Sequence, residues 1–275
     1  LLSNDPKVRS NAEAVLVQRG GRSLPLLRRF LYGENEDLHM QAFEIIRHIG
    51  PPTIPLLVEL LRHERTAFRR FAADFLIDLA PHTERIQPAL RRALRDEDVV
   101  VAGDAARALG ALGSRASPSV RALVTTLLSH DDAYVRVYAA EALASIGPRG
   151  AAATRDLAVA LGDPVPGVRW AAGEALASIG PAASSAVPQL IEALNDKFLY
   201  VRICAASALG SIGPKAHAAR EALTSAAKDP ALRGEAEWAL NRIVGIKSEQ
   251  PNVSVVGSAS VAPRATATDT PTSNP

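Results

Sequence analysis

A thirteen-residue segment recurs eight times along the chain, and its fifth residue is always Ala. Its three clearest copies read VRVYAAEALASIG (Val135 to Gly147), VRWAAGEALASIG (Val168 to Gly180) and VRICAASALGSIG (Val201 to Gly213). The copies begin 30 to 34 residues apart. A fixed period in this range indicates a solenoid, in which each unit buries its apolar face against its neighbours. The invariant residues are Ala12, Ala42, Ala72, Ala105, Ala139, Ala172, Ala205 and Ala236.

Each period predicts two helices, the second of which is the recurring segment. When its residues are numbered from zero, positions 0, 4, 7, 8 and 11 share one helical face, which we expect to be buried. Gly at position 12 is typical of a helix end, and Pro often follows it. Ala at position 4 indicates that a neighbouring helix approaches too closely for a larger side chain. We therefore expect Ala172 and Ala205 to be fully buried.

Composition narrows the class of function. The 31 basic and 29 acidic residues give a net charge of +2, which offers no electrostatic case for nucleic-acid binding. One cysteine, Cys204, precludes an internal disulfide, and at its helix position a packed thiol is the favoured interpretation. The sequence has no apolar run long enough for membrane insertion and no secretory signal. It contains a single His-Glu pair, His63-Glu64, and no column of histidines, so we predict no metal and no cofactor.

The two ends of the chain differ from its middle. Leu1-Leu2 aligns with the end of a first helix, so we expect the first repeat to be truncated at its N-terminus. A targeting segment or a further domain upstream of this repeat would lie outside the sequence. The repeats predict a solenoid over 1–245. Residues 246–275 are rich in Ser, Thr, Ala and Pro without helical periodicity, which predicts a disordered tail. The compartment stays open, with the cytoplasm favoured.

The segment "VR-x-x-A-A-x-A-L-x-x-I-G-P", preceded by a turn Asp, resembles HEAT-like repeats of the type found in bacterial phycobilisome-lyase HEAT-like proteins. The resemblance covers residues 1 to about 245 and is clearest between Asp132 and Pro214. It implies an all-α, right-handed superhelix of about eight armadillo-type helix pairs. Related proteins include scaffolds, bilin lyase subunits and a di-iron deoxyhypusine hydroxylase. The hydroxylase would need several His-Glu pairs, so that activity does not fit this chain.

Two columns of charge run through the repeats. Arg recurs at position 1 and Asp recurs in the preceding turn, which predicts a ladder of ion pairs and turn caps between repeats; phosphate binding is the alternative. An Arg-rich stretch from Arg62 to Arg95 is explained by solvated helix faces, with an acidic partner as the alternative. The two columns are Arg9, Arg69, Arg136, Arg169, Arg202 and Arg233, and Asp5, Asp98, Asp132, Asp163, Asp196 and Asp229.

Positions 2 and 6 of the segment point away from the predicted core and carry both tryptophans of the chain. We call the following residues the inner strip and expect them to be partly exposed on the concave face: Val137, Glu141, Trp170, Glu174, Ile203 and Trp238. Exposed Trp beside Val and Ile is typical of a binding surface. The competing interpretation is that Trp170 covers a neighbouring turn and that the tail covers Trp238.

These patterns predict a monomeric, non-catalytic scaffold or adaptor that binds another protein on its concave face. The alternatives are an enzyme-associated role, such as a bilin-lyase-type subunit, and recruitment through the tail or through a missing N-terminal segment.

Overall fold

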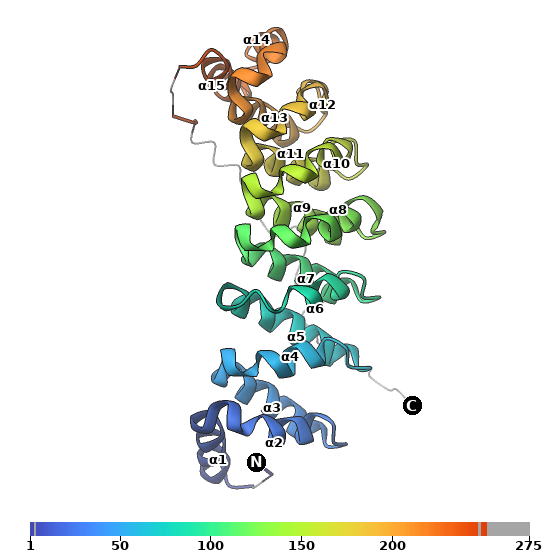
Figure 1. Cartoon of the computed structure of the whole chain (residues 1–275), viewed down its shortest axis with the longest axis vertical. Helices are drawn as coiled ribbons and strands as arrows, with labels where there is room; N and C mark the ends of the chain where they lie inside the picture. The colour runs from blue at the N-terminus through green and yellow to red at the C-terminus, as the bar shows by residue number, and fades with distance from the viewer. Residues whose placement is uncertain (3, 247–248, 252–275) are drawn as a thin grey trace, which may run out of the picture.

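The chain forms a single file of stacked helix pairs, as a computed structural model describing residues 1–2, 4–246 and 249–251 shows (Figure 1). The described residues contain α-helices and short 3-10 helices and no strand, which confirms the predicted all-α solenoid. The first helices of the pairs are α2 (Leu24–Leu31), α4 (Ile54–Leu60), α6 (Gln87–Ala93), α8 (Val120–Ser129), α10 (Thr154–Ala160), α12 (Val187–Ala193) and α14 (Arg220–Ala226). The second helices, which the recurring segment forms, are α1 (Pro6–Arg19), α3 (Glu36–Ile49), α5 (Thr66–Leu79), α7 (Val99–Ala111), α9 (Ala133–Ile146), α11 (Pro166–Ile179), α13 (Leu199–Ile212) and α15 (Arg233–Ile243).

The odd-numbered helices end where the sequence predicts. Gly147, Gly180 and Gly213 follow α9, α11 and α13 with φ of 64°, 69° and 69°. This left-handed conformation is available to glycine without steric cost, and it turns the chain into a 3-10 segment that leads to the next helix. These connecting segments are η1 (Gly20–Ser23), η2 (Pro51–Thr53), η3 (Ala80–His82), η4 (Gly113–Ser119), η5 (Gly147–Ala153), η6 (Gly180–Ala186) and η7 (Gly213–Ala219).

The invariant Ala column lies where adjacent odd-numbered helices meet. Ala172 and Ala205 are fully buried, as predicted, and so are the other column members from Ala42 to Ala236. From α5 to α15, adjacent odd-numbered helices pack against each other much more extensively than adjacent even-numbered helices do. The more tightly stacked layer of a curved solenoid is expected on its inside, so we refer to the odd-numbered helices as the inner helices. Their outward-facing side chains therefore line the inner face.

The predicted ion-pair ladder joins successive repeats. The Arg169 guanidinium binds both carboxylate oxygens of Asp196, at 2.7 and 3.0 Å, and its third nitrogen donates to the Asp163 carbonyl at 2.8 Å. The same Asp196 carboxylate accepts from the Phe198 N–H at 2.8 Å and so fixes the turn before α13. Equivalent ion pairs join Arg69 to Asp96, Arg136 to Asp163 and Arg202 to Asp229.

One rung differs from the sequence pattern. Asp96, which the pattern did not select, pairs with Arg69, whereas Asp98 pairs with the exposed Arg70 and caps α7 by accepting from the Val101 N–H. The turn before α7 contains acidic residues at 96, 97 and 98, and sequence spacing alone does not distinguish which one faces the preceding repeat.

The predicted domain limits stay predictions. The last described helix ends at Ile243, close to the expected solenoid boundary at 245. Of the tail expected over 246–275, the structure describes only residue 246 and residues 249–251, so most of it lies outside the described residues. No helix in the described part of the chain has the length and apolar character that a bilayer crossing requires.

Candidate protein-binding face

The inner strip projects from four consecutive inner helices. Val137 and Glu141 lie on α9, Trp170 and Glu174 on α11, Ile203 on α13 and Trp238 on α15. Val137, Glu141, Trp170 and Glu174 are each partly exposed, as expected. Ile203 and Trp238 are not, because each retains only 8% of its accessible surface. The prediction of an exposed row is thus correct for α9 and α11 and wrong for α13 and α15.

Packing between repeats explains this correction. The Trp238 ring lies directly over Gly210 of α13, so closely that a Cβ atom there would overlap it. Ile203 joins the continuous apolar core formed by the stacked helices. The angular argument places position 2 away from the core of its own repeat, but it takes no account of the neighbouring repeat. The exposed apolar part of the strip is therefore Val137 and Trp170.

Two carboxylates beside these apolar side chains lack a partner. Burial raises the pKa of Glu174, and burial also raises that of Glu141, against a smaller opposing effect from Arg107. No described side chain forms a hydrogen bond or an ion pair with either carboxylate. A partly dehydrated carboxylate without a counter-charge is unfavourable and favours a cation or a hydrogen-bond donor.

Two further acidic residues on the inner helices were not predicted. Glu235 on α15 is 4% exposed, burial raises its pKa, and its Oε2 has no hydrogen-bond partner among the described residues. Asp104 on α7 is 5% exposed; burial raises its pKa, although Arg107 binds it at 2.9 Å. Both occupy position 3 of the segment, where the sequence pattern places the edge of the buried stripe. Sequence periodicity gives no signal that an acidic side chain there would be dehydrated.

An aromatic cluster extends the inner face beyond the strip. Tyr134 and Tyr138 on α9 meet edge to face with ring centroids 4.3 Å apart, and the Arg107 guanidinium lies 5.5 Å from the Tyr138 centroid. Gly103 on α7 makes room for this cluster, because a Cβ there would lie 2.9 Å from Tyr134 Cε1. The inner face from α7 to α11 thus combines aromatic rings, apolar side chains and carboxylates.

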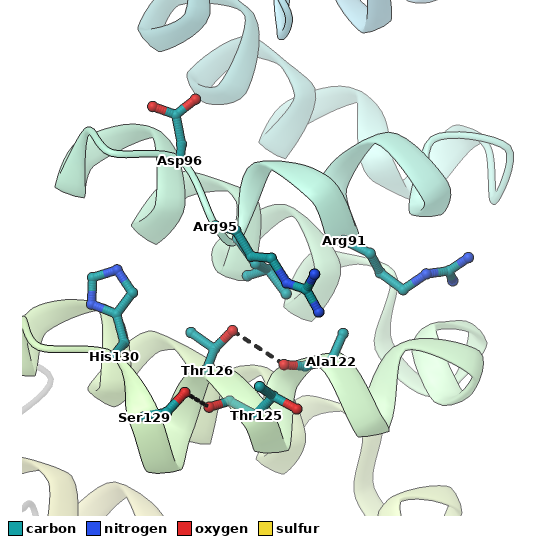
Figure 2. A pocket seen from close by; sticks show the side chains of 9 residues that line it. Arg91, Arg95, Asp96, Ala122, Thr125, Thr126, Ser129 and His130 are labelled. Atoms are coloured by element: carbon teal, nitrogen blue, oxygen red, sulfur yellow. Dashed lines mark hydrogen bonds between the residues drawn. The ribbon is translucent and has the colours of Figure 1, made fainter.

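A hollow of about 290 Å³ lies between α6 and α8, away from the inner strip (Figure 2). It is found where the ladder lacks an ion pair. α7 has Ala102 in place of the repeating Arg, and His130 aligns with the Asp that pairs in other repeats, whereas Asp132, which the sequence pattern selected, caps α9 by accepting from the Tyr134 N–H. Arg91 and Arg95, from the Arg-rich stretch, line it. The Thr126 and Ser129 hydroxyls donate to carbonyls of their own helix, so they do not offer protons to a ligand.

Cys204 is a packed thiol, as predicted. It is 1% exposed, its Sγ donates to the Val201 carbonyl at 3.1 Å, and burial raises its pKa well above the ordinary range. Gly173 of α11 accommodates its sulfur, because a Cβ at that position would overlap it. Within the described residues, no three His, Cys, Asp or Glu side chains are grouped so that they could hold a metal ion.

Comparison with known proteins identifies the repeat. The family model for HEAT repeats matches residues 54–126, 120–186 and 181–241. An engineered protein of known structure is 26% identical, with a TM-score of 0.57, over 70% of this chain and 96% of its own. A second engineered protein is 23% identical, with a TM-score of 0.60, over 89% and 77% respectively. No curated protein matches the sequence.

A third similar structure is the complex of CpcE and CpcF of phycocyanin lyase from Nostoc sp. PCC7120. It is 22% identical to this chain, with a TM-score of 0.46, over 81% of this chain and 94% of the other.

Proposed function

Because the chain belongs to the family of HEAT repeats, we propose that it is a non-catalytic scaffold or adaptor whose inner face binds a segment of another protein. The observation that carries this proposal is that, on adjacent helices, a carboxylate without a hydrogen bond or ion pair to a described side chain lies on the same face as a partly exposed apolar side chain. Glu141 and Val137 stand on α9, and Glu174 and Trp170 stand on α11.

The chemistry of this face defines the partner that would fit it. A Lys or Arg side chain would pair directly with Glu141 or Glu174, which no described side chain does, and would stabilise their ionised forms. Trp170 would contribute a large, rigid contact at low cost in side-chain entropy, which is why Trp is enriched among residues that dominate binding energy. The expected partner segment is therefore apolar with a basic residue beside its apolar side chains.

A selection from a random peptide library tests this proposal, because it identifies the peptide sequences that the protein binds without assuming their chemistry. Peptides that the full chain selects should combine Lys or Arg with aliphatic or aromatic residues. Their binding should be lost in Trp170→Ala and weakened in Glu174→Gln. Val159→Ala is the matched control, because Val159 is an exposed apolar residue on α10, in the other helix layer, with 66% of its surface accessible.

Selected peptides that bind wild type and Trp170→Ala equally would contradict the proposal. If the selected peptides lack basic residues but still require Trp170, the inner face is a binding surface, but the proposed preference for a basic segment is wrong.

A further inference from the structure

The chain that leaves α15 returns to the inner face. Gln250 donates a hydrogen bond from Nε2 to the Ser207 hydroxyl of α13 at 2.8 Å, and it also hydrogen-bonds Glu235 of α15. Pro251 lies against Gly234, with its Cγ 3.6 Å from the place where a Cβ of residue 234 would stand. Gly234 occupies position 2 of its repeat, the position that Trp170 occupies on α11. The last described residues are therefore seated at one end of the row that contains the inner strip.

We propose that the segment that follows, residues 252–264, docks along the inner strip from α13 toward α9. The protein's own tail then occupies the face that we propose for a partner, and a partner must displace it. This inference rests on the proposed function of that face.

The composition of the segment complements the strip. Its one charged residue is Arg264, and it carries no acidic residue that Glu141 or Glu174 would repel. Its apolar side chains can contact Trp170 and Val137, and Arg264 can supply the positive charge that the two carboxylates lack. The four β-branched apolar residues of the segment are Val253, Val255, Val256 and Val261.

The length of the segment is sufficient. Packed helices lie ~8–10 Å apart, so α11 lies roughly 20 Å and α9 roughly 30 Å from α15 along the inner face. An extended chain advances ~3.3 Å per residue, so a residue near 258 reaches α11. Arg264 is 13 positions beyond Pro251, which gives it a reach of about 43 Å. It can therefore meet Glu141 or Glu174 with length to spare.

Covalent attachment makes even weak docking effective. A segment tethered by a short linker experiences an effective concentration on the order of millimolar at a nearby site. Gln250 and Pro251 shorten the free linker further, because they already lie on the inner face. A partner would need to bind more tightly than the tethered tail, which would restrict binding to segments of the right chemistry.

A spin-label experiment on the full chain tests the docking. The chain has two tryptophans, so labelling with ¹⁵N-Trp gives two indole signals, which Trp170→Phe assigns. Ser258→Cys provides the attachment site for a nitroxide, because the native Cys204 is 1% exposed. We expect the nitroxide to reduce the intensity of the Trp170 indole signal more than that of Trp238. An unlabelled peptide of residues 249–266 in excess should restore the Trp170 signal.

The opposite order would overturn the inference. A tail that moves freely beyond Pro251 stays nearer to α15 on average, so Trp238 would lose more intensity than Trp170. The variant Glu141→Lys/Glu174→Lys should produce that same order by repelling Arg264, and an unchanged spectrum in this variant would contradict the role of the carboxylates. Spin-labelled chain without ¹⁵N, mixed with unlabelled ¹⁵N-Trp chain, should leave both signals intact, since docking is intramolecular. Peptide binding through Trp170 would survive a failure of this test, so the two proposals can be judged separately.

Discussion

The indole ring of Trp238 on α15 lies against the backbone of Gly210 on α13, in space that any other residue at position 210 would fill. Helix propensity alone favours Ala over Gly by ~1 kcal/mol in a helix interior. At position 210, however, an added Cβ would overlap the ring and would lie 3.0 Å from the Ala239 Cα. The close approach of α13 and α15 thus depends on the absence of a side chain.

Gly210→Ala should therefore lower the free energy of unfolding by about 1–3 kcal/mol, the usual cost of overpacking a core. Gly167→Ala on α11 is the control, because its Cβ would lie 3.6 Å from Val137 Cγ2, an ordinary contact. Chemical denaturation of both variants checks this. If Gly210→Ala proves as stable as Gly167→Ala, the indole does not pack as described. In a Trp238→Ala background, Gly210→Ala should destabilise much less, because only the close approach to the Ala239 backbone remains.

The ion-pair ladder predicts a large loss of stability when one partner is removed. Arg169 and Asp196 are almost fully buried at the side chain, with 8% and 12% exposed. Arg169→Ala leaves Asp196 without its counter-charge, which should cost about 3–5 kcal/mol. Arg70→Ala is the control, since Arg70 is 52% exposed in its pair with Asp98, and such exposed pairs contribute ~1 kcal/mol or less. Equal melting temperatures for the two variants would refute a structural role for the ladder.

The same ion pair gives a pH dependence. Burial raises the pKa of Asp196, but hydrogen bonds from Arg169 and the Phe198 N–H outweigh it, so its pKa in the folded state is below the ordinary value. This stabilisation is present above the pKa of the unfolded chain, near 4, and is lost as the pH falls through the folded-state pKa. The difference in unfolding free energy between wild type and Arg169→Ala should thus shrink in acid. A difference that does not vary with pH would contradict this assignment.

We expect Glu174 to affect the pH dependence of stability in the opposite direction. Burial raises its pKa, so the folded protein loses stability as the pH rises from the unfolded-state value through the folded-state value. Glu174→Gln removes this cost and should raise the melting temperature at pH 7, with little effect near pH 4. The same substitution should weaken peptide binding. A lower melting temperature at pH 7 would show that Glu174 has a stabilising partner and is not available to a ligand.

Ala172 tests the spacing of the inner layer. Ala172 is fully buried between inner helices, so Ala172→Leu should destabilise the fold by about 1–3 kcal/mol through overpacking. An unchanged melting temperature would contradict the close packing of the inner helices at Ala172.

Much of the fold follows from local rules that the repeat makes visible. Gly180 and Gly213 mark helix ends because they adopt a positive φ, and the Ala column marks the closest approach of helices. The pairing of Arg169 with Asp196 follows from a spacing of 27 residues that recurs along the chain. Each of these features can be predicted by aligning the repeats, because it recurs at the same position in several of them.

The inner face was less predictable because its burial depends on contacts between repeats. The periodicity of one helix does not reveal that Gly210 admits Trp238, or that Ile203 joins the core of the stack. The raised pKa of Glu235 likewise reflects its burial in the folded stack, which outweighs its hydrogen bond with Gln250. Such effects arise from three-dimensional packing, so the sequence predicts the row but not which of its members are accessible.

Isothermal titration of one library-selected peptide against wild type and Trp170→Ala tests the central claim, that the inner strip is a binding face, most directly. We predict that Trp170→Ala weakens binding by about 2 kcal/mol or more, roughly 30-fold in Kd. Its melting temperature should fall much less than that of Trp238→Ala, because Trp170 is partly exposed whereas Trp238 is 8% exposed. Unchanged affinity together with a large loss of stability in Trp170→Ala would show that Trp170 is a packing residue and that the strip is not an interface.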